Sequence, residues 1–245
     1  MAHFVLVHGA WHGGWCWRRV VQALASQGHT AHAVTLTGVG ERAHLMSSAI
    51  TLETHISDVL LAIEAEELQN VVLAVHSYAG MIGTAIADRQ PQRLKHLVYV
   101  DAVVPRPGES WGGTHASAVR EGRLAAAQAS PDYSFPPPDP AVFGLAGDDL
   151  EWVRRRMTAH PGHPYTAPLN FDPKRVASVP RTFVNCTRPA LGTIDAIRLR
   201  LADARYWDGA WQGGAGARMV ELQTGHDPMI TAPADLTRLL LEAAA

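Results

Sequence analysis

The sequence predicts an α/β protein built on a mainly parallel sheet, with helices on both faces and a small helical lid. Three observations predict this class. Short apolar, β-branched runs alternate with segments of helical periodicity over most of the 245 residues. Several apolar runs are followed directly by glycine or by a polar residue, as expected where a strand ends. Over residues 105–178 this alternation stops, and a proline-rich stretch appears instead.

The first part of the chain, residues 1–104, supplies strands and helices in alternation. Each predicted strand is a short apolar run, as expected for a strand covered on both faces. The predicted helices carry an apolar stripe or end at a stop signal such as Gly28 or Pro91. Alternation of this kind favours parallel pairing. The strands are expected at 3–7, 30–36, 71–75 and 96–100, and the helices at 16–26, 52–67 and 81–88.

Residues 105–178 are interpreted as a lid rather than as a separate domain. The proline-rich run 136–140 excludes regular structure, whereas 116–129 and 148–157 can each form a helix. The segment has too little apolar periodicity for a core of its own. It is therefore expected to cover the carboxyl ends of the strands, where open α/β sheets bind ligands. The core resumes over residues 179–245, with strands at 181–186 and 219–222 and helices at 194–202 and 233–242.

Composition excludes several classes of partner. A net charge of -2 and a pI near 6.7 indicate no basic surface, so nucleic acid is not an expected partner. The first residues show neither a signal peptide nor a membrane span, which makes the cytoplasm the default location. Cys16 and Cys186 are far apart and are expected to be free thiols. No metal is predicted, because no histidine lies in an H-x-x-x-H pattern backed by acids. The oligomeric state is left open, with a homodimer as one option.

Ser77 is the candidate nucleophile. It follows a buried-type strand and precedes a helix, so its side chain should project above the sheet beside the free N–H groups of the helix. This is the geometry of a nucleophile elbow, whose usual sequence is G-x-S-x-G. Here Val75 and Ala79 occupy the glycine positions, and we expect neighbouring chain to have receded to admit Val75. An ordinary serine N-cap is the alternative.

A serine hydroxyl reacts only when a base takes its proton. His226 follows the last predicted strand and should lie at the same sheet edge as Ser77, the alternative being a solvated turn histidine. An oxyanion would need two N–H donors. One candidate is the N–H of Tyr78, immediately after the nucleophile. The other is the N–H of Ala10, in the glycine-rich loop 8–14, unless that loop is only a tight turn.

Together, residues 3–15, the elbow, residues 97–102 and the pair Gly225-His226 resemble the α/β-hydrolase superfamily. More narrowly, the chain resembles bacterial carboxylesterases of the pyrethroid-hydrolase kind, related to plant salicylate methylesterases and hydroxynitrile lyases. The similarity runs over nearly the whole chain. It implies a Ser-His-acid esterase with a small cap and no cofactor.

The acid is where the sequence departs from this family pattern. In many relatives an aspartate follows the strand that here ends at Cys186, but the next carboxylate in this chain is Asp195. Other α/β-hydrolases, notably haloalkane dehalogenases, take the acid from the strand after that of the nucleophile, where this chain offers Asp101. A carboxylate there can orient an imidazole and stabilise its charged form. Asp101 is preferred to Asp195, and a missing acid or a role of Asp101 as a cap are the alternatives.

Aromatic and sulfur side chains of the lid and of loop 8–14 predict an apolar pocket for a bulky or aromatic acyl or alcohol group. Trp11, Trp111 and Trp152 are the named substrate-binding candidates, and the alternative is that such residues only seal the lid. The predicted function is hydrolysis of a hydrophobic or aromatic carboxylic ester of a small molecule through an acyl-serine. A C–C lyase or cyclase with the same Ser/His site and a non-catalytic ligand-binding protein are the alternatives.

Overall fold

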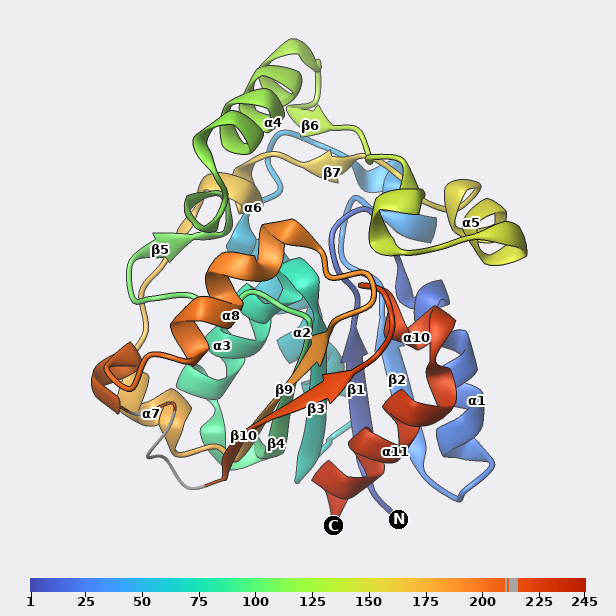
Figure 1. Cartoon of the computed structure of the whole chain (residues 1–245), viewed down its shortest axis with the longest axis vertical. Helices are drawn as coiled ribbons and strands as arrows, with labels where there is room; N and C mark the ends of the chain where they lie inside the picture. The colour runs from blue at the N-terminus through green and yellow to red at the C-terminus, as the bar shows by residue number, and fades with distance from the viewer. Residues whose placement is uncertain (210, 212–215) are drawn as a thin grey trace.

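The computed structural model describes residues 1–209, 211 and 216–245, and a six-stranded sheet forms its centre (Figure 1). Each pair of neighbouring strands is parallel, in the order β10-β9-β4-β3-β1-β2, which confirms the predicted mainly parallel sheet. Strands β1 and β3 are apolar runs that are buried over nearly their whole length, as two-sided burial requires. The strands are β1 (His3–Val7), β2 (Thr30–Val34), β3 (Val71–His76), β4 (Leu94–Val100), β9 (Arg181–Cys186) and β10 (Ala217–Leu222).

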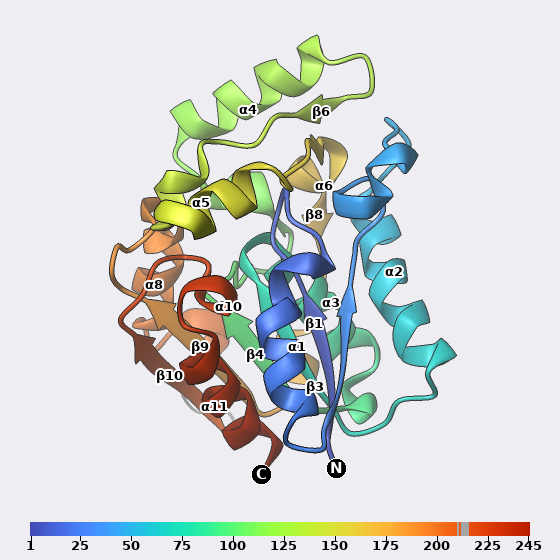
Figure 2. The ribbon, with the colours of Figure 1, turned by 90° about the vertical axis from the view of Figure 1, so that its right-hand side faces the viewer.

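Helices cover both faces of this sheet (Figure 2). On one face α1 (Arg18–Ala25) packs against α11 (Pro233–Ala244), and on the other α2 (Leu52–Ala65) packs against α3 (Gly80–Arg89). Helix α2 begins where Thr51 and Thr54 exchange side-chain-to-backbone hydrogen bonds, a capping box. Its apolar stripe then faces the core, as the sequence periodicity predicts. Two further helices, α8 (Asp195–Leu201) and α10 (Pro228–Thr231), lie beside the last strands.

Most of the connection between β4 and β9 lies over the carboxyl ends of the strands, and α7 (Pro173–Ala177), at the lower left of Figure 1, then leads back toward the amino end of β9 (Figures 1 and 2). Two antiparallel pairs, β5 with β8 and β6 with β7, tie its parts together. Its elements are β5 (Glu109–Ser110), α4 (Ser117–Ala129), β6 (Ser134–Phe135), α5 (Gly147–Arg154), β7 (His160–Pro161), α6 (His163–Thr166), β8 (Pro168–Leu169) and α7 (Pro173–Ala177). The division of the chain at residues 104 and 178 stays a prediction.

Several predicted boundaries shift, and short 3-10 helices flank some of the regular elements. The helix predicted from Cys16 starts as such a turn, and another forms in the predicted loop after β2. The helix predicted over 148–157 ends early, at Arg154. The 3-10 turns are η1 (Gly14–Trp17), η2 (Gly40–Leu45), η3 (Ser77–Ala79), η4 (Pro91–Arg93), η5 (Trp111–Thr114), η6 (Pro140–Phe143), η7 (Gly192–Ile194) and η8 (Tyr206–Gly209).

The order of the strands fixes where a ligand can bind. The chain leaves β1 for β2 on one side and returns to β3 on the other side. The loops after β1 and β3 therefore meet at the carboxyl edge of the sheet, at the switch point where open α/β sheets bind ligands. The lid covers this edge.

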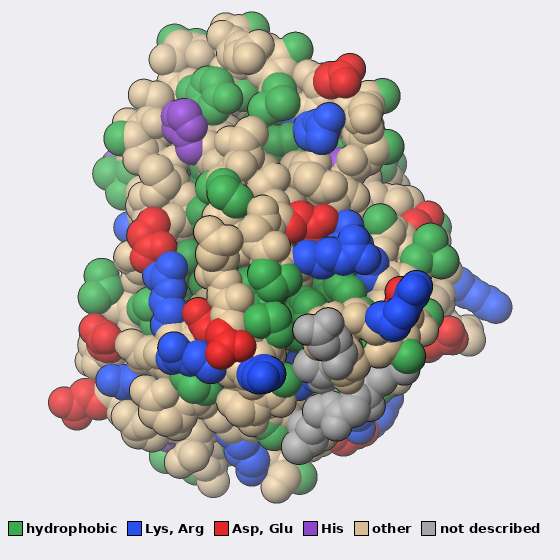
Figure 3. Space-filling model, turned by 90° about the vertical axis from the view of Figure 1, so that its left-hand side faces the viewer, with side chains coloured by type: hydrophobic (Ala, Val, Ile, Leu, Met, Phe, Trp, Pro, Cys, Tyr) green, Lys and Arg blue, Asp and Glu red, His purple; other side chains and the backbone are tan. Residues whose placement is uncertain are grey.

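Figure 3 shows basic and acidic side chains interspersed on one face of the molecule rather than gathered by sign. Both cysteines, Cys16 and Cys186, are buried and free. Over the described residues, every helix is too short or too polar to cross a membrane.

Candidate active site

Ser77 lies at the end of β3 in a left-handed backbone conformation, with φ of 54°. A residue with a Cβ is strained there by roughly 1–3 kcal/mol, so the surrounding structure must hold it in place. One restraint is the hydrogen bond from the Val103 N–H to the Ser77 carbonyl, at 2.9 Å. The residue that precedes α3 is Ala79, not Ser77, and no side chain caps that helix. This strained turn is an elbow and differs from an ordinary serine N-cap.

The room for Val75 comes from a glycine on the facing helix. A Cβ built at Gly83 of α3 would lie 2.9 Å from both methyl carbons of Val75 and 3.0 Å from Cδ1 of Leu97. A Cβ at Gly80 would meet the Val103 carbonyl oxygen at 1.8 Å. The close approaches that need glycine in this elbow therefore occur on α3, after the serine, rather than in the strand before it.

His226 is held by a buried carboxylate. Its Nδ1 lies 2.7 Å from Oδ2 of Asp101, and both side chains are buried. The other oxygen, Oδ1, accepts from Nη2 of Arg198 at 2.8 Å and from the Cys186 N–H at 3.4 Å. Asp195 instead binds Arg198 from outside, with its side chain 62% exposed. The structure thus brings Asp101, and not Asp195, to His226.

The loop that carries His226 is clamped from two sides. The His226 N–H donates to the carbonyl of Phe143 in the lid at 2.8 Å. The two segments are so close that a Cβ at Gly225 would lie 2.3 Å from the same oxygen. From below, Nε2 of His76 donates to the His226 carbonyl at 2.9 Å. Burial holds the pKa of His76 well below its ordinary value, so this ring is neutral. His76 therefore helps to hold the loop that carries His226.

The loop after β1 approaches Ser77 closely. A Cβ at Gly9 would lie 2.7 Å from Cβ of Ser77 and 2.8 Å from Nδ1 of His76, so only glycine fits. His8 holds this loop, because its Nδ1–H donates to the Gly9 carbonyl at 2.7 Å while Nε2 accepts from the Leu36 N–H at 3.1 Å. Burial lowers the pKa of His8 to about 3, which keeps the ring neutral and this tautomer fixed.

The two N–H groups considered as oxyanion donors, those of Ala10 and Tyr78, are both in buried residues at this edge. Within the described part of the chain, neither N–H has a hydrogen-bond acceptor. The Tyr78 hydroxyl lies 3.0 Å from Nδ1 of His55, whose Nε2–H donates to the Thr37 carbonyl at 2.9 Å. Burial lowers the pKa of His55 to about 4, so its Nδ1 is free to accept from Tyr78. The residue after Ser77 is thereby fixed.

Ser77 and His226 open into one cavity of about 270 Å³ beneath the lid. Ligand sites typically measure ~300–1,000 Å³, so this cavity suits a small substrate. Its walls are mainly apolar and aromatic and come from both the core and the lid. They include Trp11, Trp111, Val119, Val142, Phe143 and Ile194.

Trp152, the third tryptophan predicted to bind substrate, lies outside this cavity. Its ring packs edge-on against Trp15, with centroids 5.0 Å apart, and the Arg156 guanidinium covers it at 4.9 Å. Trp152 lies on α5, and its partner Trp15 lies in the 3-10 turn η1, directly before α1. Trp152 therefore seals the lid onto the core.

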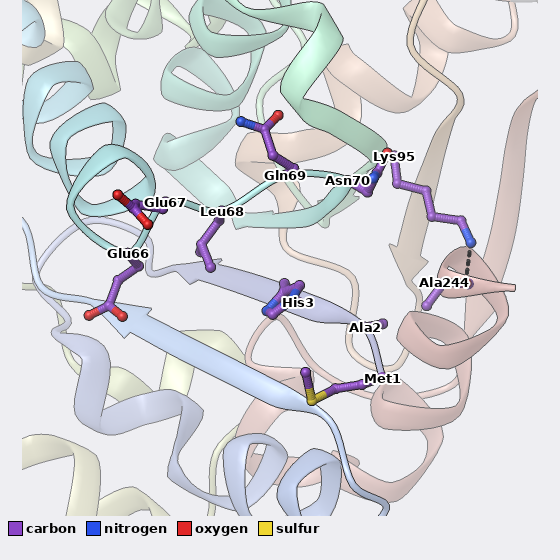
Figure 4. A pocket seen from close by; sticks show the side chains of 10 residues that line it. All are labelled: Met1, Ala2, His3, Glu66, Glu67, Leu68, Gln69, Asn70, Lys95 and Ala244. Atoms are coloured by element: carbon purple, nitrogen blue, oxygen red, sulfur yellow. Dashed lines mark hydrogen bonds between the residues drawn. The ribbon is translucent and has the colours of Figure 1, made fainter.

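A larger cavity, of about 660 Å³, lies at the opposite edge of the sheet, between the two ends of the chain (Figure 4). Its lining contains His3 and Lys95, and the Lys95 ammonium donates to the Ala244 carbonyl. No serine or cysteine lines it. It therefore offers no nucleophile to its histidine, and cavity size alone does not identify the reactive site.

Sequence reasoning missed a buried ion pair that joins the two loops of the site. His12 donates from Nδ1 to the Ala10 carbonyl at 2.8 Å and from Nε2 to Oδ2 of Asp227 at 3.2 Å. Since both acceptors are oxygens, both ring nitrogens carry protons. The only signal in the sequence was the position of Asp227 directly after His226. Arg198 was missed too, since nothing in its helix indicates that it reaches Asp101.

The charges of this pair follow from its surroundings. Burial alone would lower the pKa of His12, but the attraction of Asp227 and hydrogen bonds to Asp227 and Ala10 outweigh it and raise the pKa above its ordinary value. Burial alone would raise the pKa of Asp227, but attraction to His12 and the hydrogen bond from His12 outweigh it and lower the pKa to about 2. The pair is ionised at neutral pH.

His76, His226 and Asp227 also place one possible metal-ligand atom each within 4.8 Å of one another. One nitrogen of each ring is already bonded, since Nδ1 of His226 binds Asp101 and Nε2 of His76 donates to a carbonyl, whereas Nδ1 of His76 and Oδ1 of Asp227 have no hydrogen-bond partner in the described structure. Asp227 is likewise bound to His12. The three side chains belong to the hydrogen-bond network of the site, and the absence of a metal stays a prediction from the sequence.

We expect Asp227→Asn to lower the free energy of unfolding by about 3 kcal/mol near pH 5.5, because His12 loses its buried counter-charge. Because folding raises the pKa of His12, protonated His12 stabilises the folded protein fully below about pH 6.5. This stabilisation is lost as the pH rises through the pKa of His12 in the folded protein. Because folding lowers the pKa of Asp227, its ionised carboxylate stabilises the folded protein above about pH 3.9. This stabilisation is lost as the pH falls toward 2. Urea unfolding at pH 5.5 and pH 9 checks this, since the deficit should shrink at pH 9.

Asp195→Asn is the matched control, because the Asp195 carboxylate is largely exposed. It should cost little stability at either pH. An Asp227→Asn deficit of the same size at both pH values would contradict the ionised pair.

Comparisons with known proteins identify the family of the chain. The alpha/beta hydrolase family pattern matches residues 4–239. The chain is 39% identical to a carbendazim hydrolyzing esterase of Nocardioides sp. (strain SG-4G), covering 98% of each chain. It is 26% identical to Methylesterase 7 of Arabidopsis thaliana, covering 98% of this chain and 95% of that one.

A solved structure gives the same fold. An extracellular alpha/beta-hydrolase from a Paenibacillus species superposes with a TM-score of 0.81 at 20% identity, covering 99% of each chain. The predicted family resemblance and fold are thereby confirmed. The chain belongs to the alpha/beta hydrolase family, and its esterase relatives support its assignment as a carboxylic ester hydrolase.

Proposed function

We propose that this protein is a serine carboxylesterase that hydrolyses a small hydrophobic or aromatic carboxylic ester through an acyl-serine intermediate. The observation that carries the proposal is the shared cavity of a strained Ser77 and of His226, which is hydrogen-bonded to Asp101. The relative named as a carbendazim hydrolyzing esterase supports the reaction class. Ser77 is the nucleophile, His226 the base and Asp101 the acid in this proposal.

In the first step His226 Nε2 takes the proton of the Ser77 hydroxyl as Oγ attacks the ester carbonyl carbon. The carbonyl oxygen becomes an oxyanion, which the N–H groups of Ala10 and Tyr78 stabilise. Asp101 accepts from Nδ1–H of His226 and stabilises the imidazolium. The C–O bond to the alcohol then breaks, and His226 returns the proton to the leaving alkoxide. An acyl-serine remains.

In the second step water replaces the alcohol. His226 takes a proton from the water, whose oxygen attacks the acyl carbon, and a second oxyanion forms in the same place. The bond to Oγ breaks, Ser77 regains its proton from His226, and the carboxylic acid leaves. The steps need only residues of this chain, the substrate and water.

Trp11 and Trp111 bind the apolar part of the substrate in this proposal. Their rings line the cavity and meet edge-on, with centroids 6.2 Å apart. Burial of a flat apolar group against such rings stabilises binding. The partner is thus a small molecule. A cytoplasmic location and a homodimer stay predictions from the sequence.

The test is a substrate panel for the purified full chain and for its Ser77→Ala variant. Methyl and p-nitrophenyl esters of benzoic and butyric acids, carbendazim, and the cyanohydrin mandelonitrile cover the alternatives. We expect hydrolysis of the esters by the wild type and none above background by the variant. Cleavage of mandelonitrile without ester turnover would show a lyase, and tight binding of the esters without turnover would show a binding protein.

A further inference from the structure

We propose that Arg123 makes the cavity selective for esters that also carry a carboxylate, such as half-esters of dicarboxylic acids. This inference rests on the proposed esterase function and adds a substrate class to it. Arg123 lies on α4 of the lid and lines the same cavity as Ser77 and His226. A substrate seated with its ester at Ser77 would present its other end to the surrounding walls, and Arg123 is a cation among them.

Aromatic rings surround the guanidinium of Arg123. Its central carbon lies 5.0 Å from the Trp11 ring centroid, 5.2 Å from that of Trp111 and 5.4 Å from that of Tyr165. The Phe135 ring follows at 6.0 Å. Such rings attract a cation through their faces and restrict its rotamers. The guanidinium is therefore held in place before any substrate arrives.

This cation has no carboxylate beside it. Among the described residues no Asp or Glu forms an ion pair with Arg123, whose guanidinium instead interacts with the Tyr165 hydroxyl and lies 3.3 Å, at Nη1, from Nδ1 of His115. Arg200 shows the contrast, since its similarly half-buried guanidinium binds both oxygens of Glu109 at 2.6 and 2.7 Å. The positive charge at Arg123 is left for a ligand to neutralise.

The neighbours of Arg123 do not supply a negative charge. Burial, and then the charge of Arg123, lower the pKa of His115 to about 3, so this ring is neutral. The Tyr165 hydroxyl lies 2.8 Å from His115 Nδ1, and burial raises the pKa of Tyr165, so this group is neutral as well. Burial lowers the pKa of Arg123, but a guanidinium stays protonated in proteins.

A carboxylate is the ligand that this arrangement suits best. A guanidinium offers parallel N–H donors that match the two oxygens of a carboxylate, and the bond is stronger where water is partly excluded. Arg123 also borders a second cavity of about 240 Å³ along Pro136, Pro137 and Pro138. The cavity that holds Ser77 measures about 270 Å³, so both ends of the substrate must be close together. One ring or a short chain between ester and carboxylate meets this condition.

The test compares esters that differ only in charge. Monomethyl terephthalate and monomethyl adipate carry a carboxylate, and their primary-amide counterparts are neutral and of the same size. We expect the wild type to give a kcat/KM ratio of charged to neutral ester of at least about tenfold in one of the two series. Arg123→Gln should bring this ratio close to one, mainly through KM, and Arg123→Lys should retain part of it.

Arg120→Gln is the matched control, because Arg120 is exposed on the same helix and does not line the cavity. It removes the same charge from the lid and should leave the ratio unchanged. A wild-type ratio near one would overturn the proposal. So would an Arg123→Gln enzyme in which both esters lose the same factor, since a purely structural role of the cation–π contacts predicts that result.

Binding to the Ser77→Ala protein separates this inference from the proposed function. Calorimetry should show tighter binding of the half-ester than of its amide, and the difference should vanish when Arg123→Gln is added. If the wild type hydrolyses neither ester but this difference is found, the esterase proposal fails and the anion subsite stands. Hydrolysis of both esters without the difference would refute only the subsite.

Discussion

The Ser77→Ala enzyme is expected to hydrolyse esters at least about 10,000-fold more slowly than the wild type, because no other nucleophile replaces Oγ at this point. The residual rate would come from the oxyanion donors and the bound geometry alone. Initial rates with p-nitrophenyl butyrate measure the loss. Ser130→Ala is the control, since the Ser130 hydroxyl binds Asp132 in the lid, and it should act within a few-fold of the wild type.

A second variant at this position separates activity from stability. Ser77→Gly should be as inactive as Ser77→Ala, yet its free energy of unfolding should rise by about 1 kcal/mol, because glycine adopts a φ of 54° without strain. Urea unfolding of the three proteins measures the difference. A Ser77→Gly protein less stable than the Ser77→Ala protein would mean that the left-handed turn is not strained.

The Asp101→Asn enzyme should lose about 1,000- to 10,000-fold in kcat with its fold intact. Arg198 and the Cys186 N–H both donate to Oδ1, so the amide oxygen of the introduced asparagine would take that place. Its NH2 group would then face Nδ1 of His226 and donate to it. The imidazole would have to carry its proton on Nε2, where it can no longer accept the proton of Ser77.

Asp195→Asn makes the same chemical change on the outer side of Arg198. Because its carboxylate does not contact His226, it should retain kcat within a few-fold. Circular dichroism and urea unfolding would show that both proteins are folded. If Asp101→Asn and Asp195→Asn lose the same factor in kcat, the loss comes from disturbing Arg198, which both carboxylates bind, and Asp101 is not the acid.

Much of the site could be predicted from the chain because parallel strands bring their carboxyl ends to one edge. Ser77, His226 and Asp101 each follow a recognisable apolar run, so their meeting follows from the order of the strands. The fold class was predictable for the same reason, since alternating patterns leave few arrangements. Glycine in loop 8–14 indicated a close approach of backbone, and Gly9 lies against Ser77.

Other parts depend on contacts between distant segments, which leave no local pattern. The composition of the lid could not show that Trp152 faces Trp15 while Trp111 faces the cavity. The pairing of His12 with Asp227 joins loops 215 residues apart. The glycine that admits Val75 lies in the next helix, at Gly83, and not in the motif itself. Such features are set by packing, which periodicity does not report.

An acyl group on Ser77 is detected most directly by the mass of the protein during turnover. The wild type would be mixed with p-nitrophenyl pivalate, quenched with acid within milliseconds to seconds, and digested for mass spectrometry. If Ser77 is the nucleophile, the peptide that contains Ser77 gains the mass of one acyl group in step with a burst of p-nitrophenol. Steady turnover with unmodified Ser77, or an acyl group on a different residue, would contradict this role of Ser77.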